Sequence, residues 1–172
     1  INFNPDSFLV KNFKDIKKKY PFKKFEINNH IIRSYYNINL INSYFDISKL
    51  NSILEIGPGS CNLVSLIKYH FKVKNFILVD LPETLSVSIP IINNLFPDSK
   101  ILFPNENLKK IDHTTLKNFD FIFITPNQIN LLSDGTVDFS INTNSFAEMH
   151  IEQVNLYIDL IQRVSKNGSY FF

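Results

Sequence analysis

The fold is decided by two neighbouring stretches of sequence, SILEIGPGSCNLVSLIKYHF at residues 52–71 and NFILVD at residues 75–80. The first stretch begins with a short apolar run, which predicts a buried strand at Ser52–Ile56, and then turns at a Gly-Pro-Gly sequence. Apolar residues three and four apart follow over Asn62–Phe71 and predict an amphipathic helix. The second stretch is another apolar run of strand length. A strand, a helix and a strand in this order predict a βαβ unit with parallel strands.

The same alternation of strands and helices continues along the rest of the chain. Further strands are predicted by apolar runs at residues 119–125, 137–143 and 169–172. Residues 101–103 fit either a short strand or a loop, because so short a run has no period. Alternating strands and helices are joined by right-handed crossovers, which give a mainly parallel sheet with both faces covered. We therefore expect an α/β fold with a Rossmann-like, doubly wound sheet.

The predicted sheet order is 3-2-1-4-5, with the five strands counted along the chain from Ser52, Asn75, Phe119, Val137 and Ser169. Pro82 is expected to open a helix that Pro90 kinks, and a last helix is expected over residues 148–165 with Gly168 as its left-handed cap. The chain starts without methionine and stops within an apolar run. The domain is therefore expected to be incomplete at its C-terminus, with the remaining strands beyond Phe172.

Residues 1–50 are expected to form an N-terminal helical segment, and residues 51–172 a ligand-binding domain. The helical pattern runs over residues 6–45 and is interrupted at Pro21. The segment holds nine Lys and Arg against four Asp and Glu, a net charge of +5, whereas the remainder carries −3. Lysines 17–19 lie among apolar residues, as on the solvated face of an amphipathic helix. Because arginine is also nearly absent, we expect no nucleic-acid partner.

The composition is that of an ordinary globular domain. Hydrophobic residues make up 44% of the chain and charged residues 20%. No apolar run approaches the roughly 18 residues that span a bilayer, and no secretory leader pattern is present at the N-terminus. A single cysteine, Cys61, fits a reducing compartment. We therefore expect no membrane span and a cytoplasmic location.

The turn after the first strand has the features of a ligand-binding loop. In a doubly wound sheet the ligand lies outside the carboxyl ends of the strands, next to the first strand. Gly57 and Gly59 allow a tight turn and a close approach of the backbone, and the following helix offers unpaired amides. Asp80 closes the second strand about 20 residues later, where an acidic residue can accept hydrogen bonds from ribose hydroxyls. The pattern predicts a ligand that contains a nucleoside.

Glu55 distinguishes between two classes of such ligands. A dinucleotide places its pyrophosphate over this loop, where a carboxylate two residues before the first glycine would repel it. S-adenosylmethionine instead presents an ammonium and a sulfonium, which a carboxylate attracts. Asn62 also stands where the dinucleotide pattern GxGxxG has its third glycine. A solvated strand-end carboxylate at Glu55 and a helix cap at Asp80 are the alternatives for each residue alone, but their combination favours S-adenosylmethionine.

Two longer stretches resemble known families. ILEIGPGSCNL followed by FILVDLPETL resembles the first two motifs of class I S-adenosylmethionine-dependent methyltransferases. VDFSINTNSFAEMHIEQVNLYIDLIQRV, residues 137–164, resembles the sugar O-methyltransferase family, and FDFIFITPNQI, residues 119–129, is similar to that family's third-strand region. The resemblance covers roughly residues 50–172. One departure is Cys61, which stands where these enzymes commonly have glycine and implies a lower affinity for the cofactor.

The resemblance implies a set of cofactor-binding residues, with Asn127 as a candidate for the adenine edge. The set comprises Glu55, Gly57, Pro58, Gly59, Asp80, Leu81, Asn127 and Asn142. Methyl transfer to a hydroxyl also needs a base for its proton. Glu148 and His150 follow the fourth strand and are the two candidates, although a helix-start carboxylate is the alternative for Glu148.

The function that these features predict is S-adenosylmethionine-dependent O-methylation of a sugar or glycan precursor. Methylation of another small molecule, a non-catalytic nucleotide-binding module and a nicotinamide-dependent oxidoreductase are the alternatives. No spacing of His, Cys, Asp or Glu is typical of a metal site. The three histidines His30, His70 and His113 are expected to be surface residues, and the sequence leaves the oligomeric state open.

Overall fold

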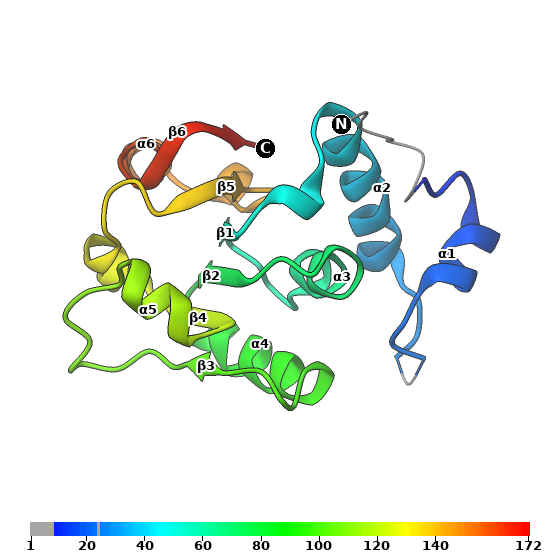
Figure 1. Ribbon diagram of the computed structural model, residues 1–172, viewed down its shortest axis with the longest axis horizontal. Helices are drawn as coiled ribbons and strands as arrows, with labels where there is room; N and C mark the ends of the chain where they lie inside the picture. The colour runs from blue at the N-terminus through cyan, green and yellow to red at the C-terminus, as the bar shows by residue number, and fades with distance from the viewer. Residues whose placement is uncertain (1–8, 24) are drawn as a thin grey trace.

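The computed structural model describes residues 9–23 and 25–172 (Figure 1). Within these residues, six strands form one parallel sheet in the order β3-β4-β2-β1-β5-β6. The strands are β1 (Ser52–Ile56), β2 (Asn75–Val79), β3 (Ile101–Leu102), β4 (Phe121–Ile124), β5 (Val137–Ile141) and β6 (Ser165–Phe171). The helices are α1 (Phe13–Lys19), α2 (Asn29–Tyr44), α3 (Asn62–Phe71), α4 (Pro82–Leu95), α5 (His113–Asn118) and α6 (Ile151–Val164).

The sheet confirms the predicted α/β fold and its strand order. Strands β4, β2, β1, β5 and β6 are the five expected strands, and they lie in the order 3-2-1-4-5. The two-residue strand β3 adds an edge beside β4, where Ile101 is paired with Phe121 and Leu102 with Ile122. Residues 101–103 therefore contain a short strand rather than only a loop.

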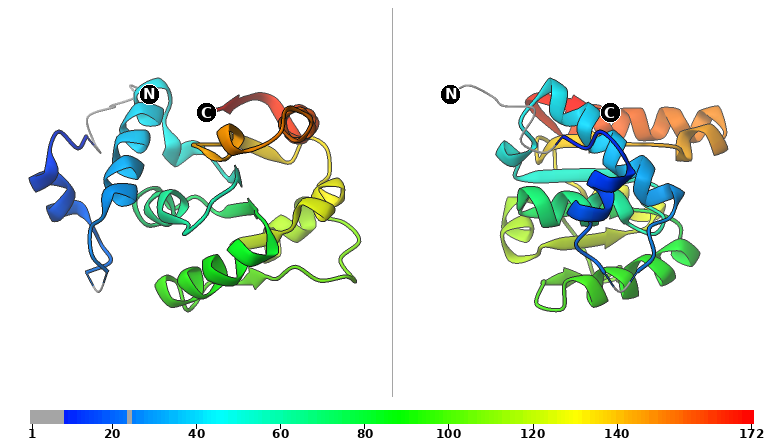
Figure 2. Two further views of the ribbon diagram at one scale, coloured as in Figure 1. Left: turned by 180° about the vertical axis from the view of Figure 1, so that it is seen from behind. Right: turned by 90° about the vertical axis from the view of Figure 1, so that its right-hand side faces the viewer.

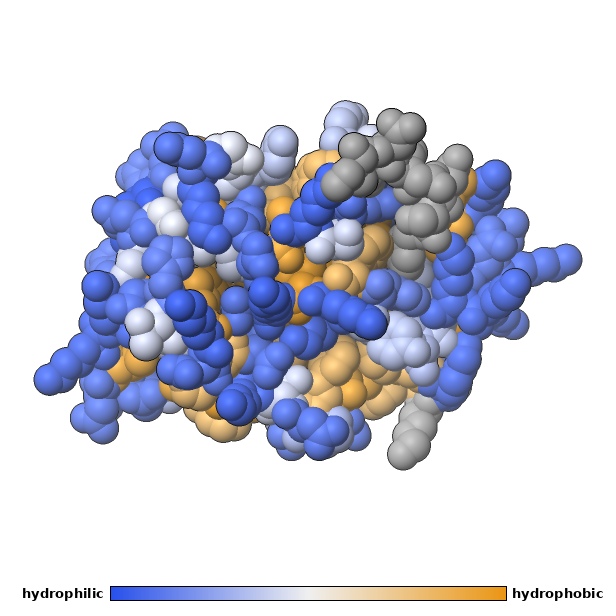
Figure 3. All heavy atoms as spheres, in the orientation of Figure 1, coloured by the Kyte–Doolittle hydropathy of each residue, from blue (hydrophilic) through white to orange (hydrophobic). Residues whose placement is uncertain are grey.

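Helices cover both faces of the sheet (Figure 2), and side chains that alternate along the strands divide the core into two layers. Ile53 of β1 packs in the layer with α2 and α3, whereas Leu54 and Ile56 pack in the layer with α6. Several of the chain's phenylalanines are the largest fully buried side chains, among them Phe76, Phe121, Phe123 and Phe139. The face drawn in Figure 3 is largely hydrophilic, with apolar patches between the polar side chains.

The N-terminal helices pack against the sheet through α3. Ile31, Tyr35 and Ile38 of α2 lie in the same buried cluster as Leu66 of α3. Asn28 caps α2, since its side chain accepts a hydrogen bond from the Ile31 amide at 3.0 Å. α2 thus lies beside α3 (Figure 1), and its residues line a hollow together with Glu55 at the end of β1.

The first helix is shorter than the predicted pattern. α1 covers Phe13–Lys19, with Ile16 buried and Lys17 and Lys18 exposed, as expected for a solvated basic face. The chain leaves the helix at Tyr20, directly before Pro21. The expected helical residues 6–8 lie outside the described residues.

The C-terminal elements correct two expectations. The helix expected over residues 148–165 begins only at Ile151 and ends at Val164. Gly168 is not its cap: it has φ 78° inside β6, where the register with β5 shifts, and β6 already starts at Ser165. A glycine with positive φ suits a bulge as well as a helix end, which is why its presence alone misplaced the boundary.

A basic hollow of about 520 Å³ lies at the amino ends of the strands. Five lysines line it together with a single carboxylate, Asp120, whose Oδ1 lies 2.7 Å from Lys68 Nζ. The lysines are Lys68, Lys72, Lys74, Lys100 and Lys117.

None of the described helices is long and apolar enough to cross a bilayer.

Candidate functional site

The loop after β1 lies directly on the end of β2. The Gly57 amide donates to the Val79 carbonyl at 2.9 Å, and the Gly59 amide donates to Asp80 Oδ2 at 3.1 Å. The other carboxylate oxygen, Asp80 Oδ1, accepts from the Leu81 amide at 2.8 Å. Gly57 and Gly59 both have positive φ, which is the conformation that glycine adopts without strain. The structure therefore brings together the glycine loop and the acidic residue that the sequence singled out.

Gly57 is the point where two loops touch. A Cβ atom on Gly57 would overlap the Ser145 side chain, whereas a Cβ on Gly59 would meet nothing within 4 Å. Ser145 belongs to the short 3₁₀ helix η4 (Ser145–Glu148), and its hydroxyl donates to the Ile56 carbonyl at 3.2 Å. The end of β1 and the segment after β5 are therefore packed too closely for any side chain at residue 57.

Asn142 ties these two loops together. Its Nδ2 donates to the Ile56 carbonyl at 3.0 Å and to Ser145 Oγ at 2.5 Å, and its Oδ1 accepts from the Phe146 amide at 3.2 Å. The side chain thus forms hydrogen bonds within the protein at both of its polar atoms. A direct cofactor contact by Asn142 stays a prediction, but its observed contacts hold the end of β5.

Glu55 forms a buried carboxylate at the end of β1. The residue is 2% exposed, and its Oε2 has no hydrogen-bond partner among the described residues. Burial, together with the neighbouring charge of Asp80, raises the pKa of Glu55 to about 8. Buried polar atoms in proteins are normally paired, so an unpaired carboxylate oxygen beside a glycine loop points to a cationic ligand.

Two adjoining hollows lie along the carboxyl ends of the strands. The first, of about 250 Å³, is lined by Glu55, by the glycine loop and by residues of α2. The second, of about 370 Å³, is lined by Asp80, Leu81 and Tyr157 together with other residues of α4 and α6. Both hollows share three lining residues, which are Gly57, Ser145 and Glu148. Together they form one groove, in which the hollow beside α6 is the more apolar part.

The predicted residues divide between this groove and its surroundings. Glu55, Gly57, Pro58, Gly59, Asp80, Leu81 and Glu148 all line it. Asn127 is exposed and lines neither hollow, although its neighbour Pro126 does. His150 is exposed immediately before α6 and also lies outside both linings. No three His, Cys, Asp or Glu side chains gather into a metal-binding group in the part of the chain that the structure describes.

The sequence reasoning missed the polar residues of α2 that line the groove, among them Ser34. His30, Arg33 and Asn37 line the first hollow, at spacings that place them on one face of the helix. His30 is therefore a groove residue and not simply a surface residue. His70, also expected at the surface, is half-buried against Tyr35, and burial lowers its pKa to about 4. The polar stripe of α2 was visible in the sequence, but its position over the sheet was not.

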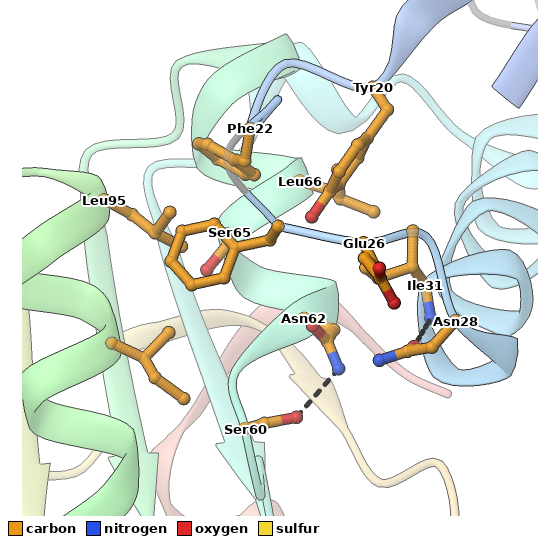
Figure 4. Close-up of a pocket in the computed structure, with 12 residues that line it drawn as sticks. Tyr20, Phe22, Glu26, Asn28, Ile31, Ser60, Asn62, Ser65, Leu66 and Leu95 are labelled. Carbon is orange, nitrogen blue, oxygen red and sulfur yellow. Dashed lines mark hydrogen bonds between the residues drawn. The ribbon is translucent and has the colours of Figure 1, made fainter. Parts of the chain in front are cut away.

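A third cavity lies on the other side of the glycine loop (Figure 4). It measures about 270 Å³ and is mainly apolar, with Phe22 and Leu66 among its walls. Ser60 and Asn62, which form a hydrogen bond of 2.8 Å, line both this cavity and the first hollow. None of the predicted catalytic or cofactor-binding residues lies in it.

Comparison with solved structures identifies the fold. The PH0226 protein from Pyrococcus horikoshii OT3 is similar with a TM-score of 0.57 and 17% identity, over 90% of this chain and 63% of that chain. The mitomycin 7-O-methyltransferase MmcR is similar with a TM-score of 0.50 and 12% identity, over 90% of this chain and 42% of that one. The chain therefore spans less than two thirds of the length of either structure. No family model matches the sequence, and no curated protein does.

Proposed function

We propose that this chain binds S-adenosylmethionine and belongs to a methyltransferase that acts on a hydroxyl group. The observation that carries the proposal is Glu55, a buried carboxylate with an unpaired oxygen beside a loop that has no room for a side chain at Gly57. The ammonium of the cofactor's amino acid is the complement of that oxygen. MmcR, which has the same fold, is by its name an O-methyltransferase, and this supports the reaction class.

The groove fits the two ends of the proposed cofactor. Glu55 and the backbone of residues 57–59 would hold the amino-acid end in the polar hollow. Asp80 has an acceptor capacity beyond its two backbone hydrogen bonds and would accept from the ribose hydroxyls. Apolar side chains, including Leu81 and Tyr157, would surround the purine in the second hollow. The bound cofactor supplies an electrophilic methyl group on its sulfonium.

Glu148 is the residue that we propose for the acceptor side. Glu148 lines both hollows and therefore lies where they adjoin, whereas His150 lines neither hollow. A carboxylate at this point can accept the proton that a hydroxyl loses during transfer. The surrounding side chains Thr143 and Asn144 are polar, which supports a sugar as the hydroxyl-bearing acceptor. His150 is the second candidate for the base.

Replacing Asp80 by alanine is expected to weaken binding of S-adenosylhomocysteine by roughly 10- to 100-fold. The reason is that hydrogen bonds to a charged acceptor contribute about 1.5–3 kcal/mol. Isothermal titration calorimetry measures the change, with Asp80→Asn expected to lose less. Asp98→Ala, at an exposed residue outside both hollows, is the control. Unchanged affinity in Asp80→Ala would remove Asp80 from the site. A wild-type chain that binds NAD but not S-adenosylhomocysteine would overturn the proposed function.

Replacing Glu148 by glutamine is expected to lower turnover by about 100-fold while cofactor binding persists, the scale expected of a general base. The acceptor is first sought by methyl transfer from labelled S-adenosylmethionine to a panel of sugars and, in parallel, of phenols and other alcohols. Transfer to the second group alone would refute the sugar acceptor. His150→Ala is the matched comparison. If His150→Ala loses turnover and Glu148→Gln retains it, the two roles are reversed.

A further inference from the structure

Helix α2 has two faces with different surroundings. Its apolar residues Ile31, Tyr35 and Ile38 are buried in the core shared with α3. A second stripe, which includes His30 and Arg33, lines the same polar hollow as Glu55. The helix thus forms one wall of the groove, although it precedes the first strand of the sheet.

Arg33 is held over that hollow by the segment after β5. With its amide oriented so that the oxygen faces a donor, Asn144 accepts a hydrogen bond from Arg33 Nη1 at 2.5 Å and donates to the Thr143 carbonyl at 2.7 Å. Only part of the guanidinium is used, because it has five N–H donors. Among the described residues, no carboxylate lies within ion-pair distance of Arg33. Its positive charge therefore faces the hollow without a protein counter-charge from those residues.

The identity of this residue is also informative. The chain has sixteen lysines and two arginines. The other arginine, Arg163, already has a carboxylate partner: it pairs with Asp134 at 2.9 Å and also donates to the Leu132 and Ile129 carbonyls. Arginine differs from lysine in offering two parallel donors to a carboxylate. Arg33, in contrast, has no carboxylate partner among the described residues.

We infer that Arg33 binds the α-carboxylate of the cofactor's amino acid, so that α2 is part of the cofactor site. The inference rests on the proposed function, since it needs a ligand with both an ammonium and a carboxylate. Glu55 and Arg33 lie in the same hollow and carry the two complementary groups. Glu55 would bind the ammonium of the cofactor's amino acid, and Arg33 would bind its carboxylate.

The experiment compares two ligands that differ in the amino acid. S-adenosylhomocysteine has the carboxylate, whereas 5′-methylthioadenosine has the same nucleoside and no amino acid. In Arg33→Gln, calorimetry is expected to show roughly 10- to 100-fold weaker binding of S-adenosylhomocysteine and unchanged binding of 5′-methylthioadenosine. Arg33→Lys is expected to fall between wild type and Arg33→Gln. Lys72→Gln, which removes an exposed positive charge outside the groove, is expected to bind both ligands as wild type does.

The outcomes separate this inference from the proposed function. If the wild-type chain does not bind S-adenosylhomocysteine, the proposed function and the inference both fail. If wild type binds it and Arg33→Gln binds it equally well, the inference alone fails, and the amides of α3 or an anionic acceptor become the alternatives. Equal weakening of both ligands in Arg33→Gln also overturns the inference, because Arg33 would then act only by shaping the wall of the groove.

Discussion

Replacing Glu55 by glutamine is expected to weaken binding of S-adenosylhomocysteine at pH 8 by more than about 100-fold, because removing one partner of a buried ion pair costs about 3–5 kcal/mol. The pKa of Glu55 near 8 adds a dependence on pH. Below pH 8 the free protein has a protonated Glu55, which must lose its proton before it can pair with the ammonium. The affinity of wild type should therefore rise by roughly 50-fold between pH 6 and pH 8 and then level off.

Glu55→Gln serves as the reference for this pH dependence, because titration of the ligand's own groups is the same for both proteins. Calorimetry over pH 6–8.5 in buffers of different ionisation enthalpy measures both the affinity and the proton released. The variant should show a flat affinity and no proton release from residue 55. An equal rise with pH in wild type and variant would show that Glu55 does not receive the ammonium.

The same residue should affect the stability of the free protein. The folded-state pKa of Glu55 lies above its ordinary value of 4.5, so its contribution to stability is complete below that pH and is lost as the pH rises to about 8. Glu55→Gln has no such loss. The variant is therefore expected to unfold at a higher temperature than wild type at pH 8 without ligand, and to differ little at pH 5.

Gly57→Ala is the second change with a large expected effect. An alanine there would keep φ near +70° and place its Cβ against Ser145, at a cost of about 1–2 kcal/mol for the conformation and 1–3 kcal/mol for the overlap. Chemical denaturation should show that loss in the free energy of unfolding. Calorimetry should show no measurable binding of S-adenosylhomocysteine, because the displaced loop lines both hollows.

Gly59→Ala is the matched control for the overlap. It has a similar φ of 53° but open space around its Cβ, so it should lose only the conformational part of the stability. Ser145→Gly combined with Gly57→Ala should recover the packing part. Equal destabilisation by the two alanine variants, or no recovery in the double variant, would contradict the close packing of the two loops.

The fold was predictable because its signals are local. The apolar runs of β1 and β2, the glycine turn between them and the helix at Asn62–Phe71 are all contiguous in sequence. Residues 101–103 were undecided because two paired residues have no period. The start of α6 was misplaced because side-chain hydrogen bonds, such as that from the Phe146 amide to Asn142, hold a separate 3₁₀ turn before it.

From the sequence, only the part of the candidate site that the ends of the strands form was predictable. Glu55 and Asp80 end adjacent parallel strands, so their spacing in sequence implied that they lie together, and the structure places them in one groove. The wall formed by α2 depends on how a helix docks far from its sequence neighbours. The polar stripe with Arg33 therefore looked like any solvated helix face. Asn127 illustrates the converse, since a residue just past a strand end is exposed outside both hollows.

The basic hollow at the amino ends of the strands gives the molecule an electrical polarity. Lysines gather at that end, whereas Asp80 and Glu148 lie at the carboxyl ends, where Glu55 adds a negative charge only as the pH rises to about 8. The domain therefore acts as a dipole along its strands. S-adenosylmethionine, with two positive groups and one negative group, would be repelled from one end and drawn toward the other. Such a field orients a diffusing ligand before any contact forms, and it weakens over distances beyond about 8 Å in physiological salt.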